Sequence, residues 1–259
     1  MPTWLQKLLT RTGLAPRPIP EALWQRTLAH YPFLAALPAA DKAQLRKLTG
    51  SFLAKKEFTG AHGLEVTDAM AVAIAAQACL PVIRIGLKYY NGFTGIVVHP
   101  GAMVARREVT DAAGVVHHYR EVLAGEAMQH GPVTLSWEDA STPGDERGHN
   151  VVIHEFVHKL DMYDGAPNGA PPLPSRVART QWQAVMQAAF EGFRRQVTMA
   201  ERFGAEWPWL DAYGATSPVE FFAVASEAYF VNRERFSVDF APLTALFDQF
   251  YRPKMAAAR

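Results

Sequence analysis

The stretch His-Glu-Phe-Val-His at residues 154–158 constrains this chain more than any other part of its sequence. It matches the pattern H-E-x-x-H, and residues four apart on a helix lie one turn above each other on the same face. His154 and His158 can therefore close on one metal ion, with the carboxylate of Glu155 aimed at a metal-bound water. Because this chemistry needs the stretch to be helical, the pattern predicts one central element of the fold.

The residues around this pattern are apolar. Val151, Val152 and Ile153 lead directly into it, and Leu160 follows it. A helix that is apolar around its histidines belongs to a protein core rather than to a surface. Burying two imidazoles and a carboxylate there costs desolvation unless a partner is present, and a metal ion would pair with all three. We expect the helix to begin between residues 145 and 150 and to end at the glycine- and proline-rich segment 165–174.

The bulk composition bounds the class of protein. The chain has 259 residues and a net charge of +1, which allows a substantial core and gives no argument for a nucleic-acid partner. No apolar stretch is long enough to span a membrane. The single cysteine, Cys79, excludes an internal disulfide, and residues 1–13 lack the apolar core of a signal peptide. We therefore expect a cytoplasmic protein with no direct nucleic-acid or membrane partner.

Helical and β-rich stretches occupy separate blocks of the chain. Residues 1–80 are expected to be helical, with helices at 22–30, 42–53 and 69–80. Residues 82–137 contain short β-branched segments, which predict strands at 82–86, 95–99, 115–123 and 133–137 and a turn at 111–114. From residue 147 onward the pattern is helical again, chiefly at 182–201, 218–232 and 242–251.

This order of blocks predicts an α+β fold. We divide the chain into a helical N-terminal region at 1–80 packed on a core at 81–253, followed by a disordered tail at 254–259. Segment 131–137 is the strand nearest in sequence to the metal helix. A strand there could accept an extended peptide by strand addition, although an ordinary internal strand is equally compatible.

A catalytic zinc site needs three protein ligands and one position left open for water, so a third ligand must be found. Asp164 follows the second histidine by six residues, a short spacing that normally needs glycine at the position of Asp161. Glu220 is the alternative, on a separate helix. Residues 217–220, Ser-Pro-Val-Glu, also form a good capping box, which would make Glu220 only a cap. The residues alone leave the choice open.

Ligating histidines usually donate their second N–H to a carboxylate or a carbonyl group. Asp161 lies seven residues after His154, on the metal-facing side if the helix persists, so it is one candidate for such an acceptor; a surface or cap position is equally compatible. Glu227 lies seven residues after Glu220 on the same helix face. It is either a further ligand candidate or a second supporting partner.

Segment 148–161, followed by Asp164-Gly165 and residues 168–172, resembles the Mlc titration factor A family, zinc-dependent peptidases whose active site is similar to that of anthrax lethal factor. Residues 131–137 and 220–230 also resemble family segments, so the likeness covers most of the chain from about residue 80. It implies a zincin-like metallopeptidase core with one Zn²⁺ per chain and Glu220 as the third ligand. Tyr213, seven residues before Glu220, would then face the metal as an oxyanion stabiliser.

The resulting hypothesis is a zinc peptidase in which Glu155 is the general base and a peptide is the substrate. The resemblance implies aminopeptidase-type activity on short peptides. The alternative is a regulatory protein that sequesters a transcriptional repressor of sugar-uptake genes, as the family's binding of the repressor Mlc implies, with catalysis secondary. A purely structural zinc site is disfavoured, because such sites usually close with four cysteine or histidine ligands.

Overall fold

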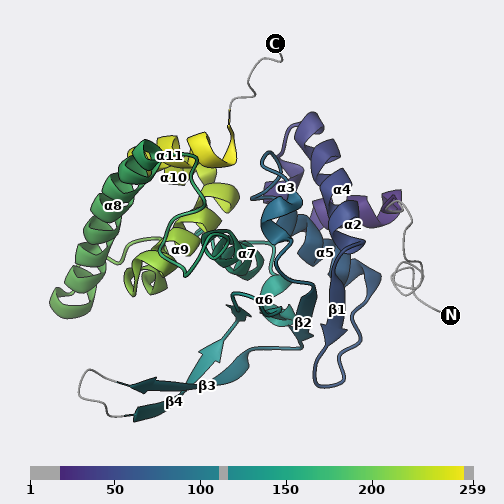
Figure 1. Ribbon diagram of the computed structural model, residues 1–259, viewed down its shortest axis with the longest axis horizontal. Helices are drawn as coiled ribbons and strands as arrows, with labels where there is room; N and C mark the ends of the chain where they lie inside the picture. The colour runs from purple at the N-terminus through teal and green to yellow at the C-terminus, as the bar shows by residue number, and fades with distance from the viewer. Residues whose placement is uncertain (1–17, 111–115, 254–259) are drawn as a thin grey trace.

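The computed structural model describes residues 18–110 and 116–253 (Figure 1). The disordered tail predicted at 254–259 and the turn predicted at 111–114 therefore lie outside the described residues, as does the N-terminal stretch 1–17. The described chain is a mixture of helices and short strands, which confirms the α+β class. No helix within the described ranges is long and apolar enough to cross a membrane.

The N-terminal part is mainly helical. It comprises α2 (Glu21–His30), α3 (Pro32–Ala35), α4 (Ala39–Leu53) and α5 (Asp68–Cys79). Thr67 caps α5 by accepting the N–H of Met70, and from Met70 onward every residue of α5 is buried, as expected for a helix that is apolar on all sides. One element departs from the prediction, because residues Glu57–Gly60 between α4 and α5 form a strand, β1.

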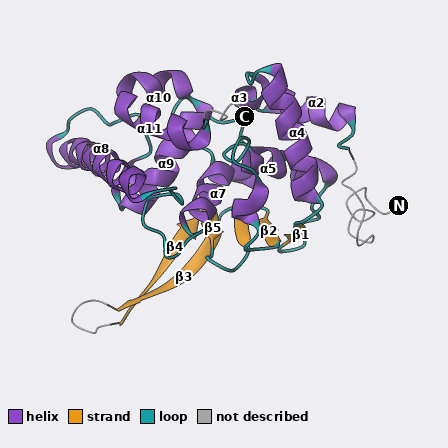
Figure 2. Cartoon of the chain, turned by 45° about the horizontal axis from the view of Figure 1, so that its top comes forward, coloured by secondary structure: helices purple, strands orange, loops and turns teal. Residues whose placement is uncertain are grey.

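A four-stranded mixed sheet lies beneath the helices (Figure 2). Its strands are β1, β2 (Gly95–His99), β6 (Val133–Ser136) and β5 (Gly125–Ala127), in that spatial order. The first three run parallel to one another, whereas β5 is antiparallel to β6; β1 and β5 are the two outer strands. The predicted strand at 133–137 is therefore paired on both sides, so strand addition next to the helix at 151–161 would have to use β5.

Two further features of the β-rich block differ from expectation. The strand predicted at 82–86 is absent: its apolar residues form consecutive turns, closed by the N–H of Gly86 donating to the carbonyl of Val82, and lead into the 3₁₀ helix η1 (Leu87–Tyr90). Strands β3 (Met103–Thr110) and β4 (Val116–Leu123) pair only with each other among the described strands. They form a ribbon that projects away from the body of the molecule (Figures 1 and 2).

Helix α7 (Val151–Asp161) lies between the N-terminal helices and the C-terminal group (Figure 1). After the short α6 (Trp137–Ala140), the C-terminal group comprises α8 (Arg176–Phe203), the 3₁₀ helix η2 (Ala212–Ala215), α9 (Pro218–Val231), α10 (Arg233–Asp239) and α11 (Ala241–Tyr251). Phe156 anchors one face of α7 in an aromatic cluster with Phe52, Tyr90 and Phe93, at ring separations of 5.6, 5.1 and 5.9 Å. This packing fixes the rotation of α7 about its axis, which directs His154 and His158 toward α9.

The start of α7 is pressed against α9. Gly148 has a φ of +75°, and a Cβ at that position would lie 2.7 Å from the Cα of Ala228. Asn150 caps α7 by accepting the N–H of Ile153 at 2.9 Å. The chain can therefore enter the helix only through a glycine turn, and this close approach brings α7 within side-chain reach of the carboxylates on α9.

Candidate metal centre

Three ligand atoms from two helices converge at one point. Nε2 of His154 and Nε2 of His158 lie 3.1 Å apart, and Oε2 of Glu220 lies 3.0 Å from the first nitrogen and 3.3 Å from the second. Zinc bonds to nitrogen and oxygen are about 2.0–2.1 Å long, so tetrahedral ligand atoms lie about 3.3 Å from one another. The triangle formed by His154, His158 and Glu220 thus has the size that one metal ion requires.

Glu220 is both close to a helix cap and in contact with the imidazoles. The hydroxyl of Ser217 accepts the backbone N–H of Glu220 at 3.2 Å, so the cap of α9 uses the main chain of Glu220. Its carboxylate is left to contact His154 and His158. Asp164 is exposed beyond the end of α7 and is not part of the group that could hold a metal. Of Asp164 and Glu220, the structure brings only Glu220 to the histidines.

Glu227 supports His154 from the other side of its ring. Nδ1 of His154 lies 2.6 Å from Oε1 of Glu227, and the second oxygen of that carboxylate accepts the backbone N–H of Asn150. The amide of Asn150 in turn donates to Oε1 of Gln77 at 2.7 Å. An Nδ1–H donated to Glu227 leaves the lone pair of His154 on Nε2, directed at the metal position.

Charge balance at the centre follows from these contacts. Burial acts to lower the pKa of the His154 imidazole, but the carboxylates of Glu227 and Glu220 outweigh it and hold this pKa well above its usual range. Burial acts to raise the pKa of both carboxyls, yet the imidazoles keep each pKa below its ordinary value. The position between the rings is therefore strongly favourable for positive charge, which a metal ion can supply in place of a proton.

Glu155 is enclosed on the face of α7 that meets the sheet edge. A Cβ on Gly125 of β5 would lie only 2.6 Å from Oε1 of Glu155, so the carboxylate fills the space that the glycine leaves. Oε2 of Glu155 is buried without a hydrogen-bond partner. Burial raises the pKa of this carboxyl, and the positive charge of His154 and His158 offsets only part of the effect. Such an unsatisfied oxygen beside a metal position is suited to accept a proton from water.

The edge strand β5 is itself tied to α7. Lys159, one residue after the second histidine, is buried and donates to the carbonyl oxygens of Met128 and Gly131 in the turn that joins β5 to β6. Its ammonium group also lies 4.4 Å from the centre of the Phe93 ring. These contacts hold the edge strand at a fixed distance from the helix that carries Glu155.

A cleft with a volume of about 450 Å³ opens onto the centre. Residues of β5 line it on one side, and Tyr213 and Asp211 line it on another. The ring centre of Tyr213 lies 6.1 Å from that of His154, and its side chain is 43 % exposed. Asp211 caps the 3₁₀ helix by accepting the N–H of Tyr213 at 2.9 Å, which places the tyrosine at the rim of the cleft.

Asp161 has partners other than the imidazoles. Its buried carboxylate accepts three backbone N–H groups, from Asn168, Gly169 and Ala170. Gly169 has a φ of +79° and lies against the carbonyl of Pro218, where a Cβ would come within 2.7 Å. Asp161 therefore fastens the loop after α7 to the start of α9, two residues before Glu220.

Sequence patterns gave no signal for several residues of the site. His149 lies 3.3 Å from Oε2 of Glu227 through its Nδ1, without the alignment of a hydrogen bond, and this contact raises the pKa of its imidazole. The sequence patterns likewise did not identify Gly125, Asn150 or Gln77 as residues of the site. A glycine with no turn around it at the edge of a short strand is the one local signal that could have identified Gly125.

Comparisons of the sequence with a family model and with known proteins point to the same family. The model of the glucose-regulated metallo-peptidase M90 family matches residues 5–252. Relatives named Mlc titration factor A include the protein of Klebsiella pneumoniae subsp. pneumoniae, 34% identical over 99% of this chain and 93% of the relative. The protein of Cronobacter sakazakii is 34% identical over 96% of this chain and 90% of the relative. That of Salmonella arizonae is 36% identical over 89% of this chain and 90% of the relative.

Proposed function

The chain belongs to the glucose-regulated metallo-peptidase M90 family, and from this premise we propose that it is a zinc-dependent peptidase with aminopeptidase-type activity on short peptides. The observation that carries the proposal is the ligand triangle of His154, His158 and Glu220, with the unpaired oxygen of Glu155 beside it. Two imidazoles and one carboxylate are a known ligand set of catalytic zinc, which keeps a fourth position open.

Each residue then has a defined part in peptide hydrolysis. Zinc, when bound, lowers the pKa of its water and polarises the carbonyl of the scissile bond. Glu155 accepts the proton of the attacking water and later returns it to the leaving amine. The hydroxyl of Tyr213 donates to the oxygen on which negative charge develops. Glu227 keeps the imidazole of His154 in the required tautomer.

The edge strand β5 offers a way to hold the substrate. Its backbone pairs only with β6 among the described strands, and its residues line the cleft. An extended peptide can add to this edge through main-chain hydrogen bonds, which bind a peptide without selecting its side chains. Gly125 in this strand leaves room for the carboxylate of Glu155 beside the outer edge.

A second function is proposed on a different observation, the name of the relatives. A protein called Mlc titration factor A matches 99% of this chain, and that name points to an interaction with the repressor Mlc. The corresponding partner here would be a transcriptional repressor of sugar-uptake genes. Its binding need not involve proton transfer, so a variant without the general base should still bind it.

Glu155→Gln tests the first proposal, because glutamine keeps the shape of the side chain but cannot accept a proton. We expect zinc content, measured by elemental analysis of the purified protein, to stay at one ion per chain. Hydrolysis of an aminoacyl fluorogenic amide should fall by roughly a hundredfold or more. Hydrolysis by the variant at the wild-type rate would show that Glu155 is not the general base. Absence of metal from the wild-type protein would show that the protein does not depend on zinc.

A repressor-binding measurement on the same variant separates the two functions. Equal affinity of wild type and Glu155→Gln for a purified Mlc-like repressor is the expected result. If neither protein binds the repressor and wild type still hydrolyses the amide, the regulatory function is rejected and only the peptidase function stands.

A further inference from the structure

The cleft at the metal centre lies next to a second cavity. His149 and Asp211 line both spaces, so they form a common wall between the cleft of about 450 Å³ and a larger cavity of about 830 Å³. The imidazole Nδ1 of His149 lies 3.9 Å from Oδ2 of Asp211. This distance is too long for a hydrogen bond, and both side chains are partly exposed, so the two residues that separate the spaces are not hydrogen-bonded to each other.

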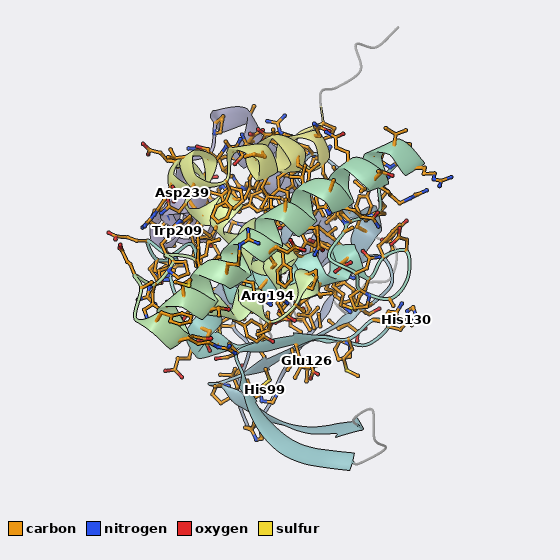
Figure 3. The ribbon with its side chains drawn as sticks, turned by 90° about the vertical axis from the view of Figure 1, so that its left-hand side faces the viewer. His99, Glu126, His130, Arg194, Trp209 and Asp239 are labelled. Atoms are coloured by element: carbon orange, nitrogen blue, oxygen red, sulfur yellow. The ribbon has the colours of Figure 1, made fainter. Side chains whose placement is uncertain are left out.

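One continuous segment connects this cavity to the catalytic rim. Residues 207–212 contribute two tryptophans to the cavity lining, and the same segment runs through Asp211 to Tyr213. Trp209 is held in place, because the guanidinium of Arg235 on α10 lies 4.7 Å from its ring and is 3.8 Å from the carboxylate of Asp239. Figure 3 shows Trp209 beside Asp239 in the helical part, away from Glu126 on the edge strand.

Trp207 differs from Trp209 in that its ring is available. Its side chain is 55 % exposed although it lines a cavity. An exposed indole in a concave site gains free energy when another apolar surface covers it, and aromatic pairs gain more than their area alone provides. The charged residues of the cavity do not favour a ligand of one charge, because arginines and acidic residues line it together, among them Arg147, Arg235, Asp145 and Glu146.

We propose that this cavity is a substrate subsite that takes an aromatic side chain of a peptide against Trp207, on the leaving side of the scissile bond. The inference rests on the proposed peptidase function. An aminopeptidase accepts only one residue before the bond that it cleaves, so a subsite for any residue other than the first lies on the leaving side of that bond. The preferred substrate is therefore a peptide several residues long rather than a dipeptide.

Two hexapeptides that differ at one position test the subsite. Both start with the same residue, and one carries phenylalanine where the other carries glycine at the third position after the scissile bond. Wild type should cleave the phenylalanine peptide with a kcat/KM about three- to tenfold higher. Trp207→Ala should abolish that preference and leave the kcat for a short aminoacyl amide unchanged, because the amide does not reach the cavity.

Phe203→Ala is the matched control. Phe203 is another exposed aromatic residue, 71 % accessible, at the end of α8, and it does not line the cavity. This variant should keep the preference for phenylalanine. The proposal is overturned if wild type shows no preference, if both variants lose it, or if Trp207→Ala lowers the rates on all three substrates equally.

A binding measurement keeps the inference separate from the peptidase proposal. Glu155→Gln protein loaded with zinc, titrated with the same hexapeptides in a calorimeter, should bind the phenylalanine peptide about three- to tenfold more tightly than the glycine peptide. Introducing Trp207→Ala into that protein should equalise the two affinities. Failure of wild type to hydrolyse any peptide, combined with this selective binding, would reject the catalysis and keep the subsite; equal affinities in Glu155→Gln would reject the subsite whatever the catalytic result.

Discussion

The two sides of the His154 imidazole carry the same kind of residue in different surroundings. On the open side, Glu220 reaches Nε2, and its side chain is 20 % exposed at the cleft. On the buried side, Glu227 reaches Nδ1, and its side chain is 2 % exposed. Both belong to α9 and are separated by two helical turns. Burial and partners, rather than residue type, therefore distinguish a carboxylate that can bind a metal from one that orients its ligand.

The largest expected effect comes from neutralising the open side. In Glu220→Gln the amide can still occupy the N-terminal turn of α9, but it lacks the negative charge that a cation needs. Zinc affinity, measured by competition with a chromophoric chelator, should fall by more than about a hundredfold, beyond the range usual for supporting residues. The metal-free protein should stay folded, because the cap uses the backbone N–H of Glu220, but it should lose the stability that the carboxylate gains from its contacts with the two imidazoles.

Asp164→Asn is the control for that experiment. Asp164 is exposed beyond α7, so this variant should bind zinc as wild type does. Metal lost with Asp164→Asn and kept with Glu220→Gln would contradict the assignment of the open side.

Neutralising the buried side should have a smaller effect on the metal. In Glu227→Gln the partner of Nδ1 loses its charge, and we expect zinc affinity to fall by about ten- to a hundredfold. The variant should also be less stable than Glu220→Gln without metal, since the carboxylate also accepts the N–H of Asn150 in a buried site. Equal losses of zinc affinity in the two variants would show that the two sides do not differ in role.

The pH dependence of zinc binding sharpens the same comparison. Since the pKa of His154 is raised in the folded protein, zinc must displace a proton there, and affinity should increase with pH until that pKa is passed. Removing the charge of Glu227 lowers the pKa of His154. The increase should therefore end at a lower pH in Glu227→Gln, whereas a merely destabilising change would leave the profile where it was.

Tyr213→Phe should have the smallest effect, and it should appear only in the chemistry. The substitution removes one hydroxyl at the rim of the open side and little volume. We expect kcat to fall by roughly tenfold or more with little change in KM and full zinc content, since the contact exists mainly in the transition state. A change in KM alone would instead make Tyr213 a substrate-binding residue.

The sequence predicted the elements whose signal is local. Helix α7 was recognisable from its motif, and α5 from an apolar run behind a threonine cap. The strand predicted at 82–86 was wrong, because buried β-branched residues also suit a series of turns, and only the carbonyl of Val82 pairing with Gly86 decides between them. Strand β1 was missed because four residues with alternate exposure carry too weak a pattern beside the lysines that precede them.

The site shows the same division between local and distant information. Spacing along α9 placed Glu220 and Glu227 on one face, but only the packing of α9 on α7 shows which oxygen meets which nitrogen. The partner of Asp161 could not be read from spacing, because it is a loop whose backbone folds back onto the helix end. Gly125 had only a weak local signal for a related reason, since its neighbour Glu155 lies on a different element.

The hydrogen bond between Asn150 and Gln77 has a consequence for modularity. Gln77 belongs to the N-terminal helices, yet it completes the cap of the helix that carries both histidines. A fragment beginning after α5 would leave this buried amide without its partner, at a cost of about 1–3 kcal/mol, and would strip the aromatic cluster around Phe156 of Phe52. The metal centre is therefore not a portable unit. Transplanting it to another scaffold requires the N-terminal helices as well as the motif.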